Sequence, residues 1–170
     1  MPRELSRTFL VVLFAMLVAA NINVYRTLLA SPALRVTVLN VGRSRAALVQ
    51  SPGGRTVLVD TGPDAGVLRA LGEALPPWQR RIDAVVLTAG VAGAAGGLPE
   101  VMSRYRVSHI ARFGAQNAPY GARLTFNDAS VEVIAPAVFT ISYGATSLPV
   151  SSSTPAGVYT SDGRTVTKLK

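Results

Sequence analysis

A nearly uninterrupted apolar strand segment is the sequence feature that most restricts the fold of this chain. Residues Ile82 to Leu87 read Ile-Asp-Ala-Val-Val-Leu, and a predicted helix lies on either side of them. Runs of this kind are typical of strands that are buried on both faces of a sheet. Strands that alternate with helices in this way predict an α/β fold built in layers.

The residues around this segment predict further strands, two short helices and several turns. Apolar residues recur at helical spacing from Ala65 to Leu75, and Pro99 lies near the start of the second helix. Before that helix, Ala89 to Gly97 is predicted to be a loop of small residues. The predicted strands are Leu34–Leu39, Ala46–Gln50, Thr56–Asp60, Ile82–Leu87 and His109–Phe113, and hairpin turns are predicted at Asn127–Asp128, Tyr143–Gly144 and Ser161–Gly163.

The composition excludes several classes of protein. Hydrophobic residues make up 49% of the 170 residues and charged residues 15%, which excludes a disordered chain. The absence of cysteine excludes disulfides, thiolate metal sites and cysteine nucleophiles. Lys and Arg number 17 against 9 Asp and Glu, and the resulting charge of +8 favours contact with anions such as nucleic acid, anionic lipid or cell-wall polymer.

The N-terminal segment differs in character from the rest of the chain. A basic start precedes an uncharged apolar run from Phe9 to Ala20, and the span from Thr8 to Val24 just reaches the length of a membrane helix. We therefore expect residues 1–30 to form a signal-anchor and linker, with residues 31–170 as one exported globular domain. A cleaved signal peptide and a buried helix of the globular domain are the two alternatives.

The small-residue loop has some features of a nucleotide-binding loop. Gly90, Gly93 and Gly96 follow a buried strand and precede a helix, as in a dinucleotide fingerprint. That fingerprint needs an acidic residue about 20 residues further on for the ribose, and after the next strand the first acid is Asp128. The loop also lacks the lysine of a P-loop. We therefore expect no nucleotide cofactor.

Candidate catalytic residues are few and scattered. His109 is the only histidine, so a metal site with several imidazoles is not available to this chain. No serine stands in a Gly-x-Ser-x-Gly elbow. Asp60 and Asp64 are the only acids close enough in sequence to suggest a carboxylate site, and Asp64 is expected to cap the following helix. The residues by themselves predict no catalysis.

Arginines supply most of the positive charge, and they occur as local pairs such as Arg43 and Arg45. Phe113 and Tyr120 are among the aromatic residues near such pairs, and a platform for stacking bases is not evident. A dispersed basic surface that holds phosphate weakly is one hypothesis. Ordinary solvated arginines are the alternative.

Two stretches carry a resemblance to a known family. They read VTVLNVGRSRAALVQSPGGRTVLVDTGP and RRIDAVVLTAGVAGAAGGLPEVMSRYRV, and they contain the motifs Val59-Asp-Thr-Gly62 and Gly96-Gly-Leu-Pro-Glu100. The chain resembles the metallo-β-lactamase-like domain of ComEC-type competence proteins, which import transforming DNA across bacterial membranes. The resemblance implies a compact, trimmed αββα sandwich over residues 31–170, with zinc or manganese at strand ends and degradation of one DNA strand.

The chain departs from this family at the metal-binding motifs. Family members carry a Thr-His-x-Asp-x-Asp-His-x-Gly-Gly pattern, of which the glycines remain here as Gly96 and Gly97. Both acids of an earlier family motif are replaced within residues 40–45, and serines occupy residues 151–153, where a later Gly-Asp would align. The four ligand positions of the first pattern are held by Ala89, Val91, Gly93 and Ala94.

The residues and the resemblance together predict a catalytically inactive domain that is anchored in the bacterial cytoplasmic membrane and has a binding or scaffolding role. We expect no metal cofactor, because these replacements leave nothing to ligate zinc or manganese. Asp60 would be a retained residue that supports the emptied site, and the partners would be the membrane with either DNA or an envelope protein complex. One alternative is an accessory protein that holds the DNA phosphate backbone at Arg43 and Arg45 without cutting it. Another is a metal-dependent hydrolase or nuclease with an atypical carboxylate site near Asp60.

Overall fold

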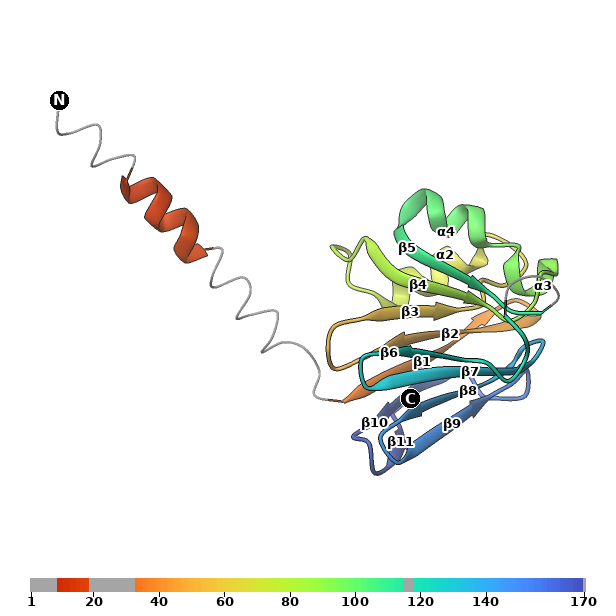
Figure 1. The fold of residues 1–170 in the computed structure, drawn as a ribbon. Coiled ribbons are helices and arrows are strands. Elements are labelled where there is room, and N and C mark those ends of the chain that lie inside the picture. The colour runs from red at the N-terminus through yellow and green to blue at the C-terminus, as the bar shows by residue number, and fades with distance from the viewer. Residues whose placement is uncertain (1–8, 19–32, 115–117, 170) are drawn as a thin grey trace. The chain divides into compact units, whose positions relative to one another are not determined.

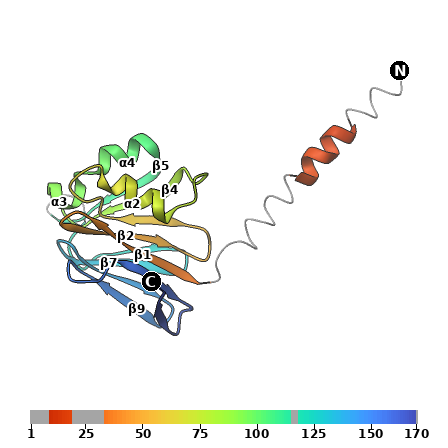
Figure 2. The same ribbon diagram turned by 180° about the vertical axis from the view of Figure 1, so that it is seen from behind.

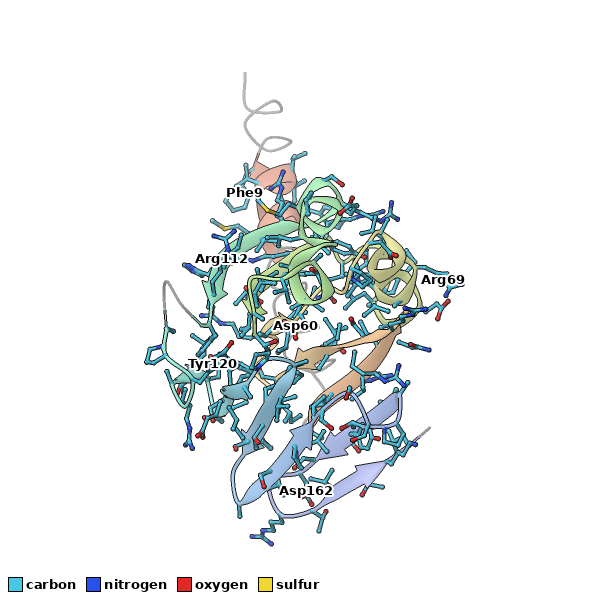
Figure 3. The ribbon with its side chains drawn as sticks, turned by 90° about the vertical axis from the view of Figure 1, so that its right-hand side faces the viewer. Phe9, Asp60, Arg69, Arg112, Tyr120 and Asp162 are labelled. Atoms are coloured by element: carbon cyan, nitrogen blue, oxygen red, sulfur yellow. The ribbon has the colours of Figure 1, made fainter. Side chains whose placement is uncertain are left out.

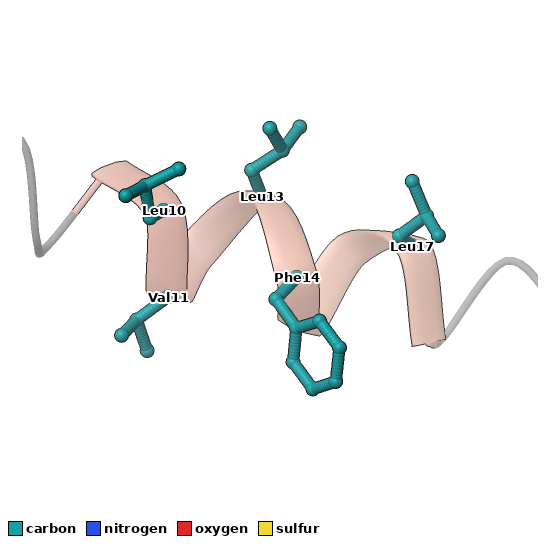
Figure 4. A pocket seen from close by; sticks show the side chains of 5 residues that line it. All are labelled: Leu10, Val11, Leu13, Phe14 and Leu17. Carbon is teal, nitrogen blue, oxygen red and sulfur yellow. The ribbon is translucent and has the colours of Figure 1, made fainter.

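The computed structural model describes residues 9–18, 33–114 and 118–169. The chain divides into two compact units, Met1–Ser31 and Pro32–Lys170. In the first unit residues 9–18 are helical, and Figure 4 shows apolar side chains on two sides of this helix. Within the described ranges no helix has both the length and the apolar character that crossing a membrane requires, so the predicted membrane helix is not supported there. The rest of that predicted helix, Thr8 and residues 19–24, lies outside the described residues.

A seven-stranded sheet forms the middle of the second unit. Its strands are β1 (Leu34–Val41), β2 (Ser44–Gln50), β3 (Thr56–Val59), β4 (Arg81–Leu87), β5 (Arg106–Arg112), β10 (Gly157–Ser161) and β11 (Val166–Lys168). Their order in the sheet is β11-β10-β1-β2-β3-β4-β5 (Figure 1). The pairs β3–β4 and β4–β5 are parallel, and the other pairs are antiparallel.

Three helices connect the parallel strands. Helix α2 (Gly66–Ala74) joins β3 to β4, while α3 (Ala92–Ala95) and α4 (Leu98–Arg104) join β4 to β5. The predicted α/β fold is confirmed, and two details are wrong. The predicted loop before the second helix contains α3, because its alanines favour a helical turn. Strand β5 begins at Arg106, which pairs with Arg81, so His109 lies within the strand and not at its start.

A smaller antiparallel sheet covers the opposite face of the large sheet. Its strands are β6 (Arg123–Phe126), β7 (Ala129–Ala135), β8 (Val138–Tyr143) and β9 (Thr146–Val150), in the order β6-β7-β8-β9. Strand pairing places turns at Asn127–Asp128 and Gly144–Ala145, and the turn between β10 and β11 spans residues 162–165. All three predicted hairpins are therefore confirmed.

Two apolar cores hold the layers together. Phe139 and Val86 belong to the core between the two sheets, and Leu71 and Val85 belong to the core between the large sheet and the helices. Strand β4 thus contributes alternate residues to both cores, as its apolar sequence predicts. Burial of apolar surface on both faces fixes this strand in the middle of the fold.

The described residues form three layers, so the predicted αββα sandwich is wrong in its outer helical layer (Figure 2). The reason lies on the outer face of the small sheet, where polar residues pair across strands. Arg123 lies opposite Glu132, with Nη2 and Oε2 2.8 Å apart, and Ser142 lies opposite Ser147. A polar sheet face can remain in water, because it has little apolar surface to bury.

Candidate functional site

The residues of the predicted site lie where two parallel strands end. Asp60 follows β3 and Thr88 follows β4, and these two strands are neighbours in the large sheet. The carboxyl ends of strands are the usual place for a ligand site in open α/β sheets. Figure 3 looks onto this end of the globular unit and shows Asp60 between the helical layer and the small sheet.

Thr88 occupies both carboxylate oxygens of Asp60. Thr88 N donates to Oδ1 at 2.8 Å, and Thr88 Oγ1 donates to Oδ2 at 2.7 Å. The same hydroxyl accepts a hydrogen bond from Ala137 N at 2.9 Å, which ties the turn between β7 and β8 to the large sheet. Both side chains are buried, and Asp60 is only 1% exposed. The three residues form a hydrogen-bonded chain across the two sheets.

Burial shifts the ionisation of the Asp60 carboxyl group to higher pH. Desolvation raises the pKa of Asp60 to about 6, and the hydrogen bonds from Thr88 oppose that rise. A buried carboxylate loses its water, so its ionised form is disfavoured. Asp60 also has a φ of 58°, a left-handed conformation that aspartate adopts more readily than most residues. Asp60 therefore holds Thr88 within the large sheet, and Thr88 in turn accepts the hydrogen bond from Ala137 of the small sheet.

The loop after Asp60 packs closely against residues 94–97, which follow the predicted ligand positions. Thr61 N donates to Ala94 O at 2.7 Å, and Gly97 N donates to Gly62 O at 3.0 Å. A Cβ atom on Gly97 would lie 2.6 Å from Asp64 O and equally close to Thr61 O. The φ of Gly97 is −82°, which any residue can adopt, so lack of space alone explains this glycine.

The four residues that stand where the family pattern has metal ligands lie between the end of β4 and the end of α3. Ala89 and Ala94 are buried, Gly93 is exposed, and Val91 is 63% exposed. A Cβ atom on Gly93 would lie 3.6 Å from Ser44 Oγ, so this segment adjoins the hairpin of β1 and β2. None of the four side chains has a nitrogen, oxygen or sulfur atom.

These residues do not fit a zinc or manganese site. Such a site needs three or four side chains with nitrogen, oxygen or sulfur donors around one point. No three His, Asp or Glu side chains among the described residues are grouped closely enough to hold a metal ion. The nearby carboxylate, Asp60, already accepts two hydrogen bonds from Thr88.

The β1–β2 hairpin carries the two predicted phosphate-binding residues, Arg43 and Arg45. Arg43 is exposed in the two-residue turn that joins the strands. Arg45 Nη1 donates to Asn40 Oδ1 at 2.6 Å, and Arg45 Nε donates to Thr154 O at 3.3 Å. Both acceptors are uncharged, and the ion pairs found among the described residues include neither arginine. The hairpin therefore presents two positive charges that form no ion pair with a carboxylate in the part of the chain that the structure describes.

Two other residues from the sequence analysis have separate places. His109 is exposed on the edge strand β5, opposite Ala84 and away from the strand ends. Asp64 Oδ1 accepts from Gly66 N, the first residue of α2, at 2.8 Å, but the N-cap residue is Ala65, so the prediction that Asp64 caps this helix is wrong by one residue. Asp60 and Asp64 thus have different hydrogen-bond partners and do not act as a carboxylate pair.

Sequence reasoning missed Thr88 and Thr154 as site residues. Thr88 had a usable signal, because it directly follows an apolar strand whose parallel neighbour ends at Asp60. The sequence could not indicate Thr154, because Arg45 donates to the backbone carbonyl oxygen of Thr154, a group that every residue has. The same holds for Ala137, which bonds Thr88 through its backbone nitrogen.

Comparison with known proteins finds similarity in solved structures. No family model and no curated protein matches the chain. The chain is similar to a HARLDQ-motif metallo-β-lactamase from Cronobacter sakazakii, with 14% identity, a TM-score of 0.47, and coverage of 74% of this chain and 62% of that one. A HARLDQ-motif mutant from the same organism has 12% identity and a TM-score of 0.46, with coverage of 69% of this chain and 58% of that one. The Rm3 metallo-β-lactamase has 13% identity and a TM-score of 0.48, with coverage of 70% of this chain and 60% of that one. The chain spans about three fifths of the length of these proteins. The chemistry of this chain follows from its own residues and not from this similarity.

Proposed function

We propose that this chain is a catalytically inactive binding protein, related to the metallo-β-lactamase-like domain of the ComEC-type DNA-uptake proteins that its motifs resemble. The observation that carries the proposal is the composition of the strand-end site. Thr88 occupies the carboxylate of Asp60, and residues 89–94 offer only aliphatic side chains and glycine. Metal-assisted hydrolysis needs several fixed ligands and one open position, and these residues supply neither.

The backbone around this site is nevertheless closely packed. Thr61 and Gly62 are hydrogen-bonded to Ala94 and Gly97, and Ala137 bonds Thr88 from the other sheet. Such contacts hold neighbouring loops in one arrangement, which is what a surface for a binding partner requires. A rigid site without ligands therefore supports a binding or scaffolding role.

We expect the full chain to show no metal-dependent hydrolysis. After treatment with a chelator, Zn²⁺ or Mn²⁺ should leave the thermal midpoint unchanged, because only a ligand that binds the native state raises it. Product formation from bis(p-nitrophenyl) phosphate and from single-stranded DNA is measured in the same samples. Turnover that disappears in Asp60→Asn but persists in Asp64→Asn would instead establish a hydrolase with an atypical carboxylate site.

The second part of the proposal is that the β1–β2 hairpin holds the phosphate backbone of DNA. Asn40 and Thr154 position the guanidinium of Arg45, and no carboxylate of the described residues pairs with Arg45 or Arg43. Guanidinium groups match phosphate oxygens in geometry and charge. An envelope protein complex is the alternative partner, and it would be favoured if DNA does not bind even at low salt.

We expect Arg43→Gln/Arg45→Gln to weaken DNA binding and to flatten its salt dependence. The slope of log Kobs against log [salt] is negative, and its absolute value should decrease by roughly 1.4 for single strands and roughly 1.8 for duplexes, because two phosphate contacts are lost. Anisotropy of labelled oligonucleotides over a salt series measures this slope. Arg69→Gln/Arg104→Gln removes the same charge from α2 and α4 and serves as the control. Equal slopes for the two double variants would reject the hairpin as the binding site.

The third part of the proposal is the location of the chain. We place it at the bacterial cytoplasmic membrane, attached through its N-terminal segment, with the globular unit on the outer side. The support is the helix over residues 9–18, whose side chains are apolar on more than one face (Figure 4). Export of the globular unit after cleavage of this segment is the alternative.

A further inference from the structure

The only tryptophan of the chain, Trp78, is 82% exposed in the loop between α2 and β4. This exposure is unusual, because a tryptophan ring normally buries most of its surface. Prolines and hydrogen bonds also restrict the conformation of this loop. Pro76 and Pro77 restrict the backbone before Trp78, and Gln79 N donates to Pro76 O at 3.0 Å. Gln79 Nε2 donates to Thr56 Oγ1 at 2.8 Å, so the loop is fixed to the start of β3.

Exposed arginines accompany Trp78 at this end of the sheet. Arg80 and Arg81 follow it within three residues, and Arg106 N donates to Arg80 O at 2.8 Å. Arg55 directly precedes the threonine that holds the loop. We call this surface the Trp78 face, and its members are Arg55, Trp78, Arg80, Arg81 and Arg106.

Few ion pairs with acidic residues neutralise the positive charge of the Trp78 face. Arg81 Nε lies 3.1 Å from Asp83 Oδ1, and the other three arginines of the Trp78 face take no part in the ion pairs found among the described residues. Backbone amides of Thr165 and Arg164 lower the pKa of Asp162, so this acid in the β10–β11 turn stays ionised. The exposed acids on neighbouring helix and strand ends are Glu73, Asp128 and Asp162.

The globular unit begins at this same end. Strand register aligns Arg35 of β1 with Gln50 and aligns Gln50 with Thr56 of β3, while β3 and β4 run parallel. The start of β1 therefore lies on the side of the sheet that carries the loop between α2 and β4, as Figure 1 shows. The chain that precedes β1 contains the apolar helix over residues 9–18. A membrane attachment through that segment would thus connect to the globular unit at the end with the Trp78 face.

We propose that the Trp78 face docks onto an anionic lipid bilayer, with the indole of Trp78 at the interface and the arginines on lipid phosphates. Tryptophan is enriched at the membrane interface, and arginines gain free energy near an anionic leaflet. A nucleic acid is favoured less, because stacking of successive bases needs several aromatic side chains and this surface has one. The inference rests on the proposed membrane attachment, and it is independent of phosphate binding at the β1–β2 hairpin.

The intrinsic fluorescence of the full chain tests this docking, because all tryptophan emission comes from Trp78. The probes are vesicles of phosphatidylglycerol and phosphatidylcholine in equal parts, and vesicles of phosphatidylcholine alone. Docking predicts a blue shift of the emission and protection from acrylamide with the mixed vesicles, and a smaller change with phosphatidylcholine. Sedimentation with the vesicles is measured in the same samples and reports attachment of the chain by any route.

Charge variants then separate docking by the Trp78 face from general attraction. Arg80→Gln/Arg106→Gln should need roughly 30-fold more anionic lipid for half of the emission shift, since each arginine near the surface contributes roughly a factor of five. Arg69→Gln/Arg112→Gln is the matched control, because it removes the same charge from α2 and from the opposite end of β5. The control should bind as the wild type does.

Each other outcome has a distinct meaning. Sedimentation with vesicles and no emission shift would overturn docking while leaving membrane attachment in place. No sedimentation would overturn both. An equal shift with pure phosphatidylcholine, or equal effects of the two double variants, would overturn the role of the arginines. A shift with a single-stranded oligonucleotide and none with vesicles would assign the Trp78 face to nucleic acid.

Discussion

Gly97→Ala should lower the free energy of unfolding by about 3 kcal/mol, the upper part of the usual range for overpacking a closed site. The added Cβ would lie 2.6 Å from two backbone oxygens, those of Asp64 and Thr61, and 2.9 Å from Val67 Cγ1. Backbone oxygens cannot turn away as the end of a long side chain can. The loop after Asp60 would have to move, and the hydrogen bond from Gly97 N to Gly62 O would be strained.

Gly93→Ala is the matched control for this substitution. Gly93 belongs to α3, and a Cβ there would meet Ser44 Oγ at an ordinary distance of 3.6 Å. Alanine favours helix over glycine by about 1 kcal/mol, so this variant should be as stable as the wild type or slightly more stable. Urea unfolding of both variants measures the difference. Equal stabilities would show that the segment around Gly97 has more room than the structure gives it.

Asp60→Asn should remove a large pH dependence of stability. Burial raises the pKa of Asp60 from 3.8 to about 6, so the folded state holds the proton more tightly than the unfolded state does. The free energy of unfolding of the wild type should therefore be highest below about pH 4 and fall by about 3 kcal/mol as the pH rises to about 7. Asparagine does not titrate, so the variant lacks this decrease.

Urea unfolding between about pH 4 and pH 8 tests the prediction as a difference between the two proteins. As the pH rises through this range, the free energy of unfolding of Asp60→Asn should increase by about 3 kcal/mol relative to that of the wild type. Asp64→Asn makes the same change at an exposed carboxyl in the same loop, and it should keep the wild-type profile. Parallel profiles for the wild type and Asp60→Asn would show that the carboxyl of Asp60 is solvated in the folded protein.

The order of strands and helices was predictable because it depends on local patterns. The apolar run that became β4, the helical spacing that became α2 and the turn residues at Asn127–Asp128 all act over a few neighbouring residues. The outer helical layer was predicted wrongly, because it came from the resemblance and not from these patterns. The polar outer face of the small sheet, with Arg123 paired to Glu132, explains why three layers suffice.

The candidate site was predictable only in part. The residue types at Ala89, Val91, Gly93 and Ala94 already exclude metal ligation by their side chains, because side-chain chemistry does not depend on the fold. The partners of Asp60 were not predictable. Thr88 is 28 residues away in sequence and reaches Asp60 only through the pairing of β3 with β4.

By itself, the sequence determined the alternation of strands and helices, the hairpins, and the absence of metal-ligating side chains between Ala89 and Ala94. The tertiary structure alone decided that Thr88 donates hydrogen bonds to both carboxylate oxygens of Asp60 and that Trp78 and Arg106 share one end of the sheet. The reason is the range of the forces. Backbone preferences act between near neighbours in sequence, whereas burial and hydrogen bonding between distant residues depend on strand register.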